Sequence, residues 1–233
     1  MLKYPCLVLD HDDTAVNSTA TVHYPAFVEF MKIHRPELRM TLEEYFRYNF
    51  DPGVIPFFRD ICGLTEAEMK EEEIFWQGFV QHRVPEAYPG IREIIDEQKR
   101  RGGKVCVISH SFSKYILRDY SRNGLAEPDL IFGWEAAPEQ RKPSVWPLEQ
   151  IMKTFGFRPE EMLVVDDLKP GYDMARAAGI PFAAAGWAND IEEIEQFMRK
   201  NCGLYFKTVP ELREYLFGEQ TEQLTTTEGG KDK

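Results

Sequence analysis

Three carboxylates lie close together near the start of the chain, directly after an apolar run that is typical of a buried strand. They are Asp10, Asp12 and Asp13, in the segment Asp-His-Asp-Asp-Thr that follows Cys-Leu-Val-Leu. In open parallel sheets, ligands bind beyond the carboxyl ends of the strands. Grouped carboxylates repel one another, and Mg²⁺, which prefers carboxylate and phosphate oxygens, would offset that repulsion. The motif alone fits a metal site and a plain acidic turn equally well.

A second acidic pair, Asp166 and Asp167, follows the apolar run Met-Leu-Val-Val. If the two strands are neighbours in a parallel sheet, these acids would meet Asp10 and Asp12 at one edge of it. Carboxylates grouped in this way would raise one another's pKa values unless a cation were bound. An Asx turn that opens the next helix is the alternative, but two acidic strand ends in one chain favour a metal site.

A serine at a strand end and a lysine further along the chain are candidate phosphate ligands. Ser109 ends the run Val-Cys-Val-Ile. Its hydroxyl and the amides that follow could hold phosphate oxygens, although such a serine is more often a helix N-cap. His110 could contact the phosphate or the leaving group, or lie exposed at the start of a helix. Lys142 would bind phosphate and offset the carboxylates, but without the other motifs it reads as a surface lysine.

The elements that must position these residues alternate between strand and helix, which predicts an α/β fold with a parallel sheet covered on both faces. The predicted strands are 6–10, 104–109, 129–132, 162–166, 181–184 and 204–206. The predicted helices are 90–101, 113–123, 145–155, 172–178 and 191–200. Each candidate carboxylate and Ser109 falls at the carboxyl end of one of these strands.

One long stretch, residues 15–88, breaks this alternation. It contains no convincing parallel strand and reads as several helices rich in aromatic residues. We therefore predict a helical subdomain inserted into an α/β core formed by residues 1–14 and 89–217. The final stretch, 218–233, is polar and repetitive and is predicted to be disordered.

The composition narrows the classes of partner. The 233 residues carry a net charge of -11, which argues against nonspecific binding to nucleic acid and to anionic membranes. A small anionic substrate remains compatible, because a local site can be positive in an acidic protein. No apolar run suits a secretory signal or a membrane span, and the four cysteines show no metal-type spacing. These features predict a cytoplasmic protein, and they carry no signal of oligomeric state.

In order and spacing, the four motifs resemble the haloacid dehalogenase-like superfamily. DHDDT at 10–14 resembles its first motif, DxDxT, and VISHS at 107–111 resembles the second, a strand that ends in Ser or Thr. RKP at 141–143 resembles the third, and VVDDLKPGYDMARAAG at 164–179 the fourth. The resemblance covers residues 4–217. It implies a Rossmann-like core in which residues 15–88 form a helical cap of the C1 type that sets substrate choice.

The resemblance also implies a Mg²⁺-dependent phosphatase that acts on a small phosphorylated metabolite. Asp10 would attack phosphorus and form an aspartyl phosphate, while Asp12 would protonate the leaving oxygen and then activate water. Ser109 and Lys142 would bind the transferring phosphoryl group. The implied metal ligands are Asp10, the backbone carbonyl of Asp12, Asp167, and Asp166 either directly or through water.

Three positions depart from the family pattern, one of them the turn after Lys142, which reads Pro-Ser-Val instead of the frequent Pro-x-Pro, and the cap offers further candidates. The family usually has Gly where this chain has Asp13, which we expect to point away from the site or to hold a water beside it. The family often has another Asp where this chain has Gly171. In the cap, Arg83 could bind a substrate anion through its planar guanidinium. Trp76 could line the pocket, although at helical spacing such residues more often pack in the core.

Three alternatives remain open from the sequence. A sugar phosphate mutase on the same fold would carry the same motifs and differ only in returning the phosphoryl group instead of releasing it. A phosphorylation-dependent signalling receiver also combines these residue types, but the motif order and the chain length disagree. A catalytically inactive binding protein on this scaffold would not need the intact set of Asp10, Asp12, Lys142 and Asp167.

Overall fold

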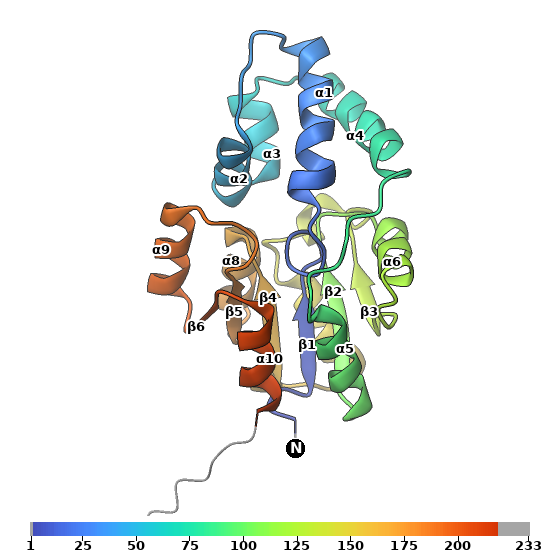
Figure 1. Cartoon of the computed structure of the whole chain (residues 1–233), viewed down its shortest axis with the longest axis vertical. Helices are drawn as coiled ribbons and strands as arrows, with labels where there is room; N and C mark the ends of the chain where they lie inside the picture. Colours follow the sequence, from blue (N-terminus) through green and yellow to red (C-terminus); the bar gives the residue numbers. More distant parts are fainter. Residues whose placement is uncertain (1, 219–233) are drawn as a thin grey trace, which may run out of the picture.

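The computed structural model describes residues 2–218 and has one six-stranded sheet at its centre (Figure 1). All strand pairings are parallel, in the order β3-β2-β1-β4-β5-β6. The strands are β1 Cys6–Leu9, β2 Lys104–Ile108, β3 Leu130–Phe132, β4 Met162–Asp166, β5 Phe182–Ala185 and β6 Leu204–Phe206. Each predicted strand agrees with these bounds to within one residue, and the predicted α/β class is confirmed.

Helices cover both faces of this sheet. The helices that pack with Cys6 and Val8 of β1 are α7 Trp146–Phe155, α8 Lys169–Ala177 and α9 Glu192–Asn201. Those that pack with Leu7 and Leu9 are α5 Ile91–Arg100, α6 Ser113–Arg122 and α10 Val209–Phe217. A strand that is buried on both faces must be apolar at every position, which is why the central strands could be recognised in the sequence.

Two helices differ from the prediction. Helix α8 begins at Lys169, three residues before the predicted start at 172, because Pro170 is well accommodated in the first turn of a helix. Helix α10 is not among the predicted elements. It carries a start signal, since the side chain of Thr208 accepts a hydrogen bond from the backbone of Glu211 and the Glu211 side chain caps the backbone of Thr208 in return.

The stretch between β1 and α5 is helical, and it forms a separate layer above the carboxyl ends of the strands (Figure 1). Its elements are η1 Thr19–His23, α1 Tyr24–His34, α2 Leu42–Phe50, α3 Val54–Pro56, η2 Phe57–Ile61 and α4 Glu66–Val80. This layer has its own aromatic core, which includes Phe27, Phe30 and Phe57. It therefore stands where the sequence predicts a cap, while the boundaries 15–88 stay a prediction.

The chain leaves and re-enters the core at one place. Val16 lies opposite Ala87 in an antiparallel bridge. The backbone N–H of Asn17 donates to the carbonyl of Glu86 at 2.9 Å, and the N–H of Tyr88 donates to the carbonyl of Ala15 at 3.0 Å. The two crossing segments are thus held side by side between the sheet and the helical layer.

The sequence also bears on membrane spans, cysteines and the C-terminal stretch. None of the helices within residues 2–218 has both the length and the apolar character that a bilayer span requires. The four cysteines are free and buried, as their apolar surroundings suggest. The predicted disordered tail lies, apart from Gly218, outside the described residues.

Candidate active site

Carboxylates from the ends of two adjacent strands meet at one point. Strands β1 and β4 are neighbours, with Leu9 in register with Val165, so the residues that follow them emerge side by side. The N–H of Asp10 donates to the carbonyl of Val165 at 2.9 Å. Asp10, Asp166 and Asp167 are all buried, and each offers an oxygen within 4.8 Å of the others. The predicted convergence of the two acidic motifs is thus seen in the structure.

Lys142 reaches into this cluster from the loop that precedes α7. Its Nζ lies 2.9 Å from Oδ1 of Asp10 and 2.7 Å from Oδ2 of Asp166, and its side chain is only 3% exposed. Asp166 is further engaged, because its Oδ1 accepts a hydrogen bond from the N–H of Leu168 at 2.8 Å. Asp166 therefore orients the lysine, and the lysine in turn contacts Asp10.

The cluster carries more negative charge than one lysine can balance. Burial raises the pKa of Asp10 to about 7, although Lys142 opposes that rise. Burial also raises the pKa of Asp167 well above its usual range, and the nearby carboxylates of Asp13 and Asp166 add to the effect. Buried carboxylates with raised pKa values are better ionised when a divalent cation lies among them. The residues present therefore fit a Mg²⁺ ion, whose preferred ligands are carboxylate oxygens.

The carboxylate of Asp12 lies apart from that cluster and forms its own network of hydrogen bonds. Its Oδ1 accepts from the Ser18 hydroxyl at 2.7 Å and from Nε2 of His23 at 2.8 Å. Its Oδ2 accepts from the Ser111 hydroxyl at 2.6 Å and the Ser109 hydroxyl at 3.2 Å. Burial tends to raise the pKa of Asp12, but His23 and Ser111 hold it well below its usual range. Of the groups of Asp12, the backbone carbonyl is then the one left to act as a metal ligand.

His23 joins Asp12 to the helical layer. The indole N–H of Trp76 donates to Nδ1 of His23 at 2.9 Å, and the two rings are stacked with centroids 5.7 Å apart. Because an indole N–H can only donate, Nδ1 must be the acceptor and Nε2 must carry the proton that is donated to Asp12. The sequence reasoning missed His23, since nothing in its spacing from Asp12 shows that η1 turns it back toward the carboxylate.

The backbone conformation of Asp13 explains why the family usually has glycine at this position. Its φ is 57°, in the left-handed region that glycine adopts freely and that Asp tolerates better than most residues. Its Oδ1 accepts a hydrogen bond from the N–H of Thr19 at 3.2 Å, at the start of the first helix of the inserted layer. Burial raises its pKa to about 6. Asp13 therefore faces the inserted layer while contributing charge near Asp167.

The glycine at position 171 also has a structural explanation. A Cβ at this position would lie 2.1 Å from Oδ2 of Asp166, so no side chain fits while Asp166 holds Lys142. The acidic residue that the family often has at this point is therefore incompatible with the present position of Asp166.

Replacing Gly171 with alanine should displace Asp166 and, through it, Lys142. Overpacking of this kind typically costs about 1–3 kcal/mol, so we expect Tm to fall by roughly 2–12 °C and phosphate release to fall by at least about 10-fold. Gly78→Ala is the matched control, because nothing lies within 4 Å of a Cβ at Gly78. Wild-type turnover and Tm in Gly171→Ala would contradict the proposed contact.

The segment after β2 supplies three residues to the site. Ser109 is buried; it donates to Asp12, and its hydroxyl accepts from the N–H of Ser111 at 3.1 Å. His110 donates from Nε2 to the carbonyl of Lys142 at 3.2 Å, and its pKa is lowered to about 3 by burial and by the charge of Lys142. His110 is therefore a neutral side chain at the pocket wall, and Ser111 is a partner of Asp12 that the sequence reasoning did not single out.

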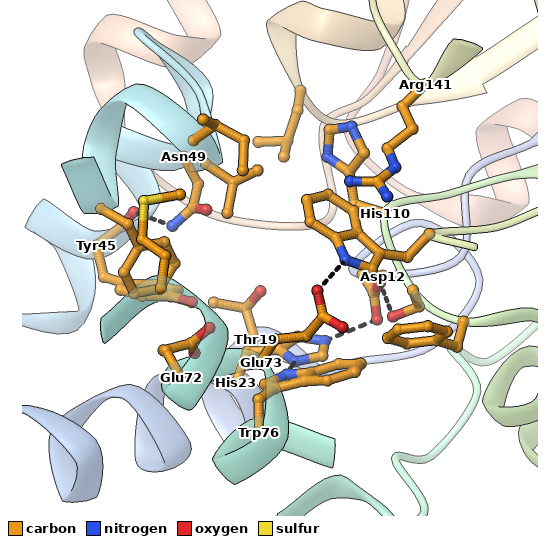
Figure 2. A pocket seen from close by; sticks show the side chains of 18 of the residues that line it. Asp12, Thr19, His23, Tyr45, Asn49, Glu72, Glu73, Trp76, His110 and Arg141 are labelled. Carbon is orange, nitrogen blue, oxygen red and sulfur yellow. Dashed lines mark hydrogen bonds and ion pairs between the residues drawn. The ribbon is translucent and has the colours of Figure 1, made fainter. Parts of the chain in front are cut away.

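A cavity of about 460 Å³ opens from these residues toward the helical layer (Figure 2). Asp12, Asp13 and Asp167 line its inner end. Aromatic side chains from both layers form much of its wall: Tyr45, Phe46, Phe58, Trp76, Phe112 and Trp134. The hypothesis that Trp76 lines the pocket is thus consistent with the structure, in which the pocket lies between the core and the helical layer.

Arg83 does not lie where the sequence reasoning put it. Helix α4 ends at Val80, and Arg83 lies in the exposed segment that returns to the core. Its Nη1 donates to the carbonyl of Phe79 at 3.0 Å, and its guanidinium stacks over the Phe79 ring at 3.5 Å. Arg83 is not among the residues that line the cavity, so it is withdrawn as a substrate-binding candidate.

Comparison with known proteins agrees with this geometry. A family model described as haloacid dehalogenase-like hydrolase matches residues 7–185. Phosphoglycolate phosphatase 1 of Pseudomonas aeruginosa is 31% identical over 123 residues, which are 52% of this chain and 43% of that protein. Pyrophosphatase PpaX of Bacillus cereus is 23% identical over 190 residues, 80% of this chain and 85% of that one. The chain matches only about half the length of the phosphoglycolate phosphatases it resembles.

The fold is also shared with solved structures. A crystal structure described as haloacid dehalogenase-like hydrolase, from Bacteroides fragilis, superposes with a TM-score of 0.75 at 20% identity. The superposition covers 90% of this chain and 100% of that one. The inserted helical layer is therefore included in the shared architecture.

Proposed function

Because the chain belongs to the haloacid dehalogenase-like hydrolases, we propose that it hydrolyses a small phosphomonoester through an aspartyl phosphate on Asp10, with Mg²⁺ as cofactor. One observation carries the proposal. The buried Asp10 carboxylate lies 2.9 Å from Nζ of Lys142, at the carboxyl edge of the sheet from which the pocket opens. A carboxylate nucleophile, a fixed cation and a second carboxylate nearby are the parts that phosphoryl transfer requires.

Asp10 is the nucleophile in this scheme. A carboxylate oxygen of Asp10 attacks phosphorus, the bond from phosphorus to the ester oxygen breaks, and the alcohol leaves with a proton from Asp12. Water then attacks the phosphorus of the aspartyl phosphate and gives a proton to Asp12, the bond from phosphorus to the Asp10 oxygen breaks, and inorganic phosphate leaves with Asp10 restored as a carboxylate. Lys142, and the hydroxyl of Ser109 when it turns from Asp12, offset the charge of the transferring group.

Asp12 must alternate between two protonation states, and its surroundings favour the ionised one. His23 and Ser111 hold its pKa well below the usual range against the effect of burial. Ionised Asp12 is ready to take the proton of the attacking water. A phosphate dianion that enters beside it raises its pKa, since a nearby negative charge disfavours a second one, and this prepares Asp12 to protonate the leaving oxygen.

The proposed metal ligands are Asp10, Asp167 and the backbone carbonyl of Asp12. Bound there, Mg²⁺ would stabilise negative charge on the phosphate oxygens. Asp166 is occupied by Lys142 and by the N–H of Leu168, so its role is to position the lysine. This assigns Asp166 the less direct of the two roles that the sequence left open.

Mg²⁺ should stabilise the protein, and more at pH 8 than at pH 5. Burial raises the pKa of Asp10 to about 7 against the opposing effect of Lys142. Between about pH 4 and pH 7, Asp10 of the metal-free folded protein therefore holds a proton that the unfolded chain has lost, and this contribution to stability disappears as pH rises through 7. Mg²⁺ binds the ionised carboxylates. At 100 times Kd it should contribute about 2.7 kcal/mol at pH 8, which is roughly 5–10 °C in Tm.

Asp167→Asn is the variant that tests this prediction by thermal denaturation. Losing one ligand should remove most of the shift, whereas Asp173→Asn, on the exposed side of α8, should keep it. Equal shifts in the wild type and in Asp167→Asn would contradict the proposed site.

The proposed activity itself is tested by phosphate release from a panel of phosphomonoesters with Mg²⁺. The panel should include 4-nitrophenyl phosphate and 2-phosphoglycolate, because phosphoglycolate phosphatases are among the relatives. Continuous release of inorganic phosphate is expected from at least one of them. Conversion of a sugar phosphate into an isomer without release would instead favour the mutase alternative.

A further inference from the structure

Arg141 and Glu72 line opposite sides of the pocket (Figure 2). At the core end, Arg141 lies near His110, next in sequence to the phosphate-binding Lys142 (Figure 2). On the side away from Arg141, Glu72 of α4 lines the cavity, while its neighbour Glu73 reaches toward Trp134 of the core (Figure 2). A phosphate group that binds beside Lys142 and Asp10 leaves the alcohol portion of the substrate to lie against the side of the pocket that carries Glu72.

Glu73 already has a partner from the core. Its Oε2 accepts a hydrogen bond from the indole N–H of Trp134 at 2.9 Å, across the gap between the helical layer and the loop after β3. Its other oxygen accepts from the side-chain amide of Gln77 at 3.5 Å. Glu73 thus closes the pocket wall and is only partly available to a ligand.

Glu72 is different, because no cation neutralises it. Burial raises its pKa to about 7, and the neighbouring Glu73 adds to that rise. No hydrogen bond or ion pair to its carboxylate is found within residues 2–218. The carboxylate lines the cavity, and a ligand that brings a positive charge would pair with it more strongly there than in bulk water.

Among the described residues, one arginine and one lysine line the cavity, and neither is paired with Glu72. The guanidinium of Arg141 lies 3.8 Å from the ring centroid of Trp134, and its Nε donates to the carbonyl of Ala136 at 2.8 Å. Figure 2 shows Arg141 on the opposite side of the pocket from Glu72. Lys70 also lines the cavity, but it is exposed and forms no ion pair with Glu72. The carboxylate of a substrate such as 2-phosphoglycolate would therefore face Glu72 without a cation between them.

The walls around Glu72 are suited to a cation. Tyr45, Phe46 and Phe58 line the cavity from the helical layer together with Trp76. The faces of aromatic rings attract ammonium groups, with the strongest effect in sites from which water is excluded. A carboxylate among aromatic side chains combines direct charge pairing with this attraction, and both favour an ammonium over a neutral or anionic group.

From these observations we propose that the substrate is a phosphomonoester whose alcohol carries a protonated amine or a quaternary ammonium, bound by Glu72 and the surrounding aromatic side chains. The proposal rests on the phosphatase function above and names its substrate class. Such a substrate is negative at the phosphate, which would bind beside Lys142, and positive at the far end, which would pair with Glu72.

Three substrates of similar length and different terminal charge test the proposal. They are 2-aminoethyl phosphate, ethyl phosphate and 2-phosphoglycolate, with 4-nitrophenyl phosphate as a reference for the chemistry. At pH 7.5 we expect kcat/KM for the amine to exceed that for ethyl phosphate by at least about 10-fold, and that for phosphoglycolate to be the lowest. Equal values for the amine and ethyl phosphate, or a preference for phosphoglycolate, would overturn the proposal.

Glu72→Gln identifies the group responsible. It keeps the size and removes the charge, so the ratio of kcat/KM between 2-aminoethyl phosphate and ethyl phosphate should fall toward 1. Glu71→Gln is the matched control: it makes the same charge change on the same helix, but its side chain is 62% exposed and does not line the cavity. An unchanged ratio in Glu72→Gln, or the same fall in both variants, would overturn the assignment.

Binding to Asp10→Asn separates this proposal from the proposed function. Calorimetry with 2-aminoethyl phosphate and ethyl phosphate needs no turnover, and the amine should bind at least about 10-fold more tightly unless Glu72 is also replaced. If this preference is found but the wild type hydrolyses no phosphate ester, the charge preference stands and the phosphatase function fails. If 4-nitrophenyl phosphate is hydrolysed but the preference is absent, the phosphatase function stands and the amine fails.

Discussion

Asp10→Asn should reduce phosphate release from every substrate by about 10³-fold or more, with Tm changed by only a few degrees. The amide keeps the shape of the carboxylate and can still accept a hydrogen bond from Lys142, which lies 2.9 Å from Oδ1 in the wild type. It is a poor nucleophile for phosphorus, so no aspartyl phosphate forms. Steady-state phosphate release and thermal denaturation of the same preparation measure the two quantities.

Asp173→Asn is the control for the Asp10 variant, because Asp173 pairs with Lys169 on the outer side of α8 at 2.8 Å. It should retain wild-type turnover. A kcat for Asp10→Asn within a few-fold of the wild type would show that no covalent step occurs at this residue. A large fall in Tm would instead mean that the carboxylate holds the fold together through Lys142.

Asp12→Asn should affect poor leaving groups far more than good ones. An alkoxide needs a proton as it departs, and losing the general acid typically costs about 10²–10⁴-fold. A nitrophenolate hardly needs that proton, so the loss on 4-nitrophenyl phosphate should be at least about 10-fold smaller. The ratio of kcat/KM for the alkyl and aryl substrates, in variant and wild type, isolates this effect from any general loss of activity.

His23→Gln provides a second arm for the Asp12 experiment. His23 donates to Asp12 at 2.8 Å, and it lowers the pKa of that carboxyl. If His23 acts by positioning and ionising Asp12, its loss should shift the pH profile of kcat while keeping the dependence on leaving group.

For Asp12→Asn itself, equal losses on alkyl and aryl phosphates would mean that Asp12 has a structural or metal-holding role.

The core of the site could be predicted because its information is local in the sequence. Each functional carboxylate directly follows an apolar strand, and in a parallel sheet all carboxyl ends lie at one edge. Asp10, Asp166 and Ser109 were placed correctly by this reasoning alone. The sequence cannot show which oxygen faces which, so the contact of Asp166 with Lys142, and the consequent need for Gly171, emerge only in three dimensions.

The sequence shows that the inserted layer is helical, but it does not show how the helices are oriented against the core. Phe75, Trp76 and Phe79 form one stripe along α4, but the stripe does not decide which of these side chains faces the pocket and which packs within the helical layer. The packing of the helical layer on the core places Trp76 and Glu72 in the pocket and leaves Arg83 outside it. The tertiary contact of His23 with both Asp12 and Trp76 is of the same kind, since it depends on how the layer docks.

The sequence by itself therefore determined the fold class, the edge of the sheet where chemistry takes place and the residue types available there. These follow from strand periodicity and from acids placed at strand ends, which need no knowledge of distant contacts. Only the tertiary structure decided which acid takes which role and which charged side chains line the pocket. Those depend on contacts between residues far apart in the chain, such as Glu73 with Trp134 across 61 positions, which local patterns do not encode.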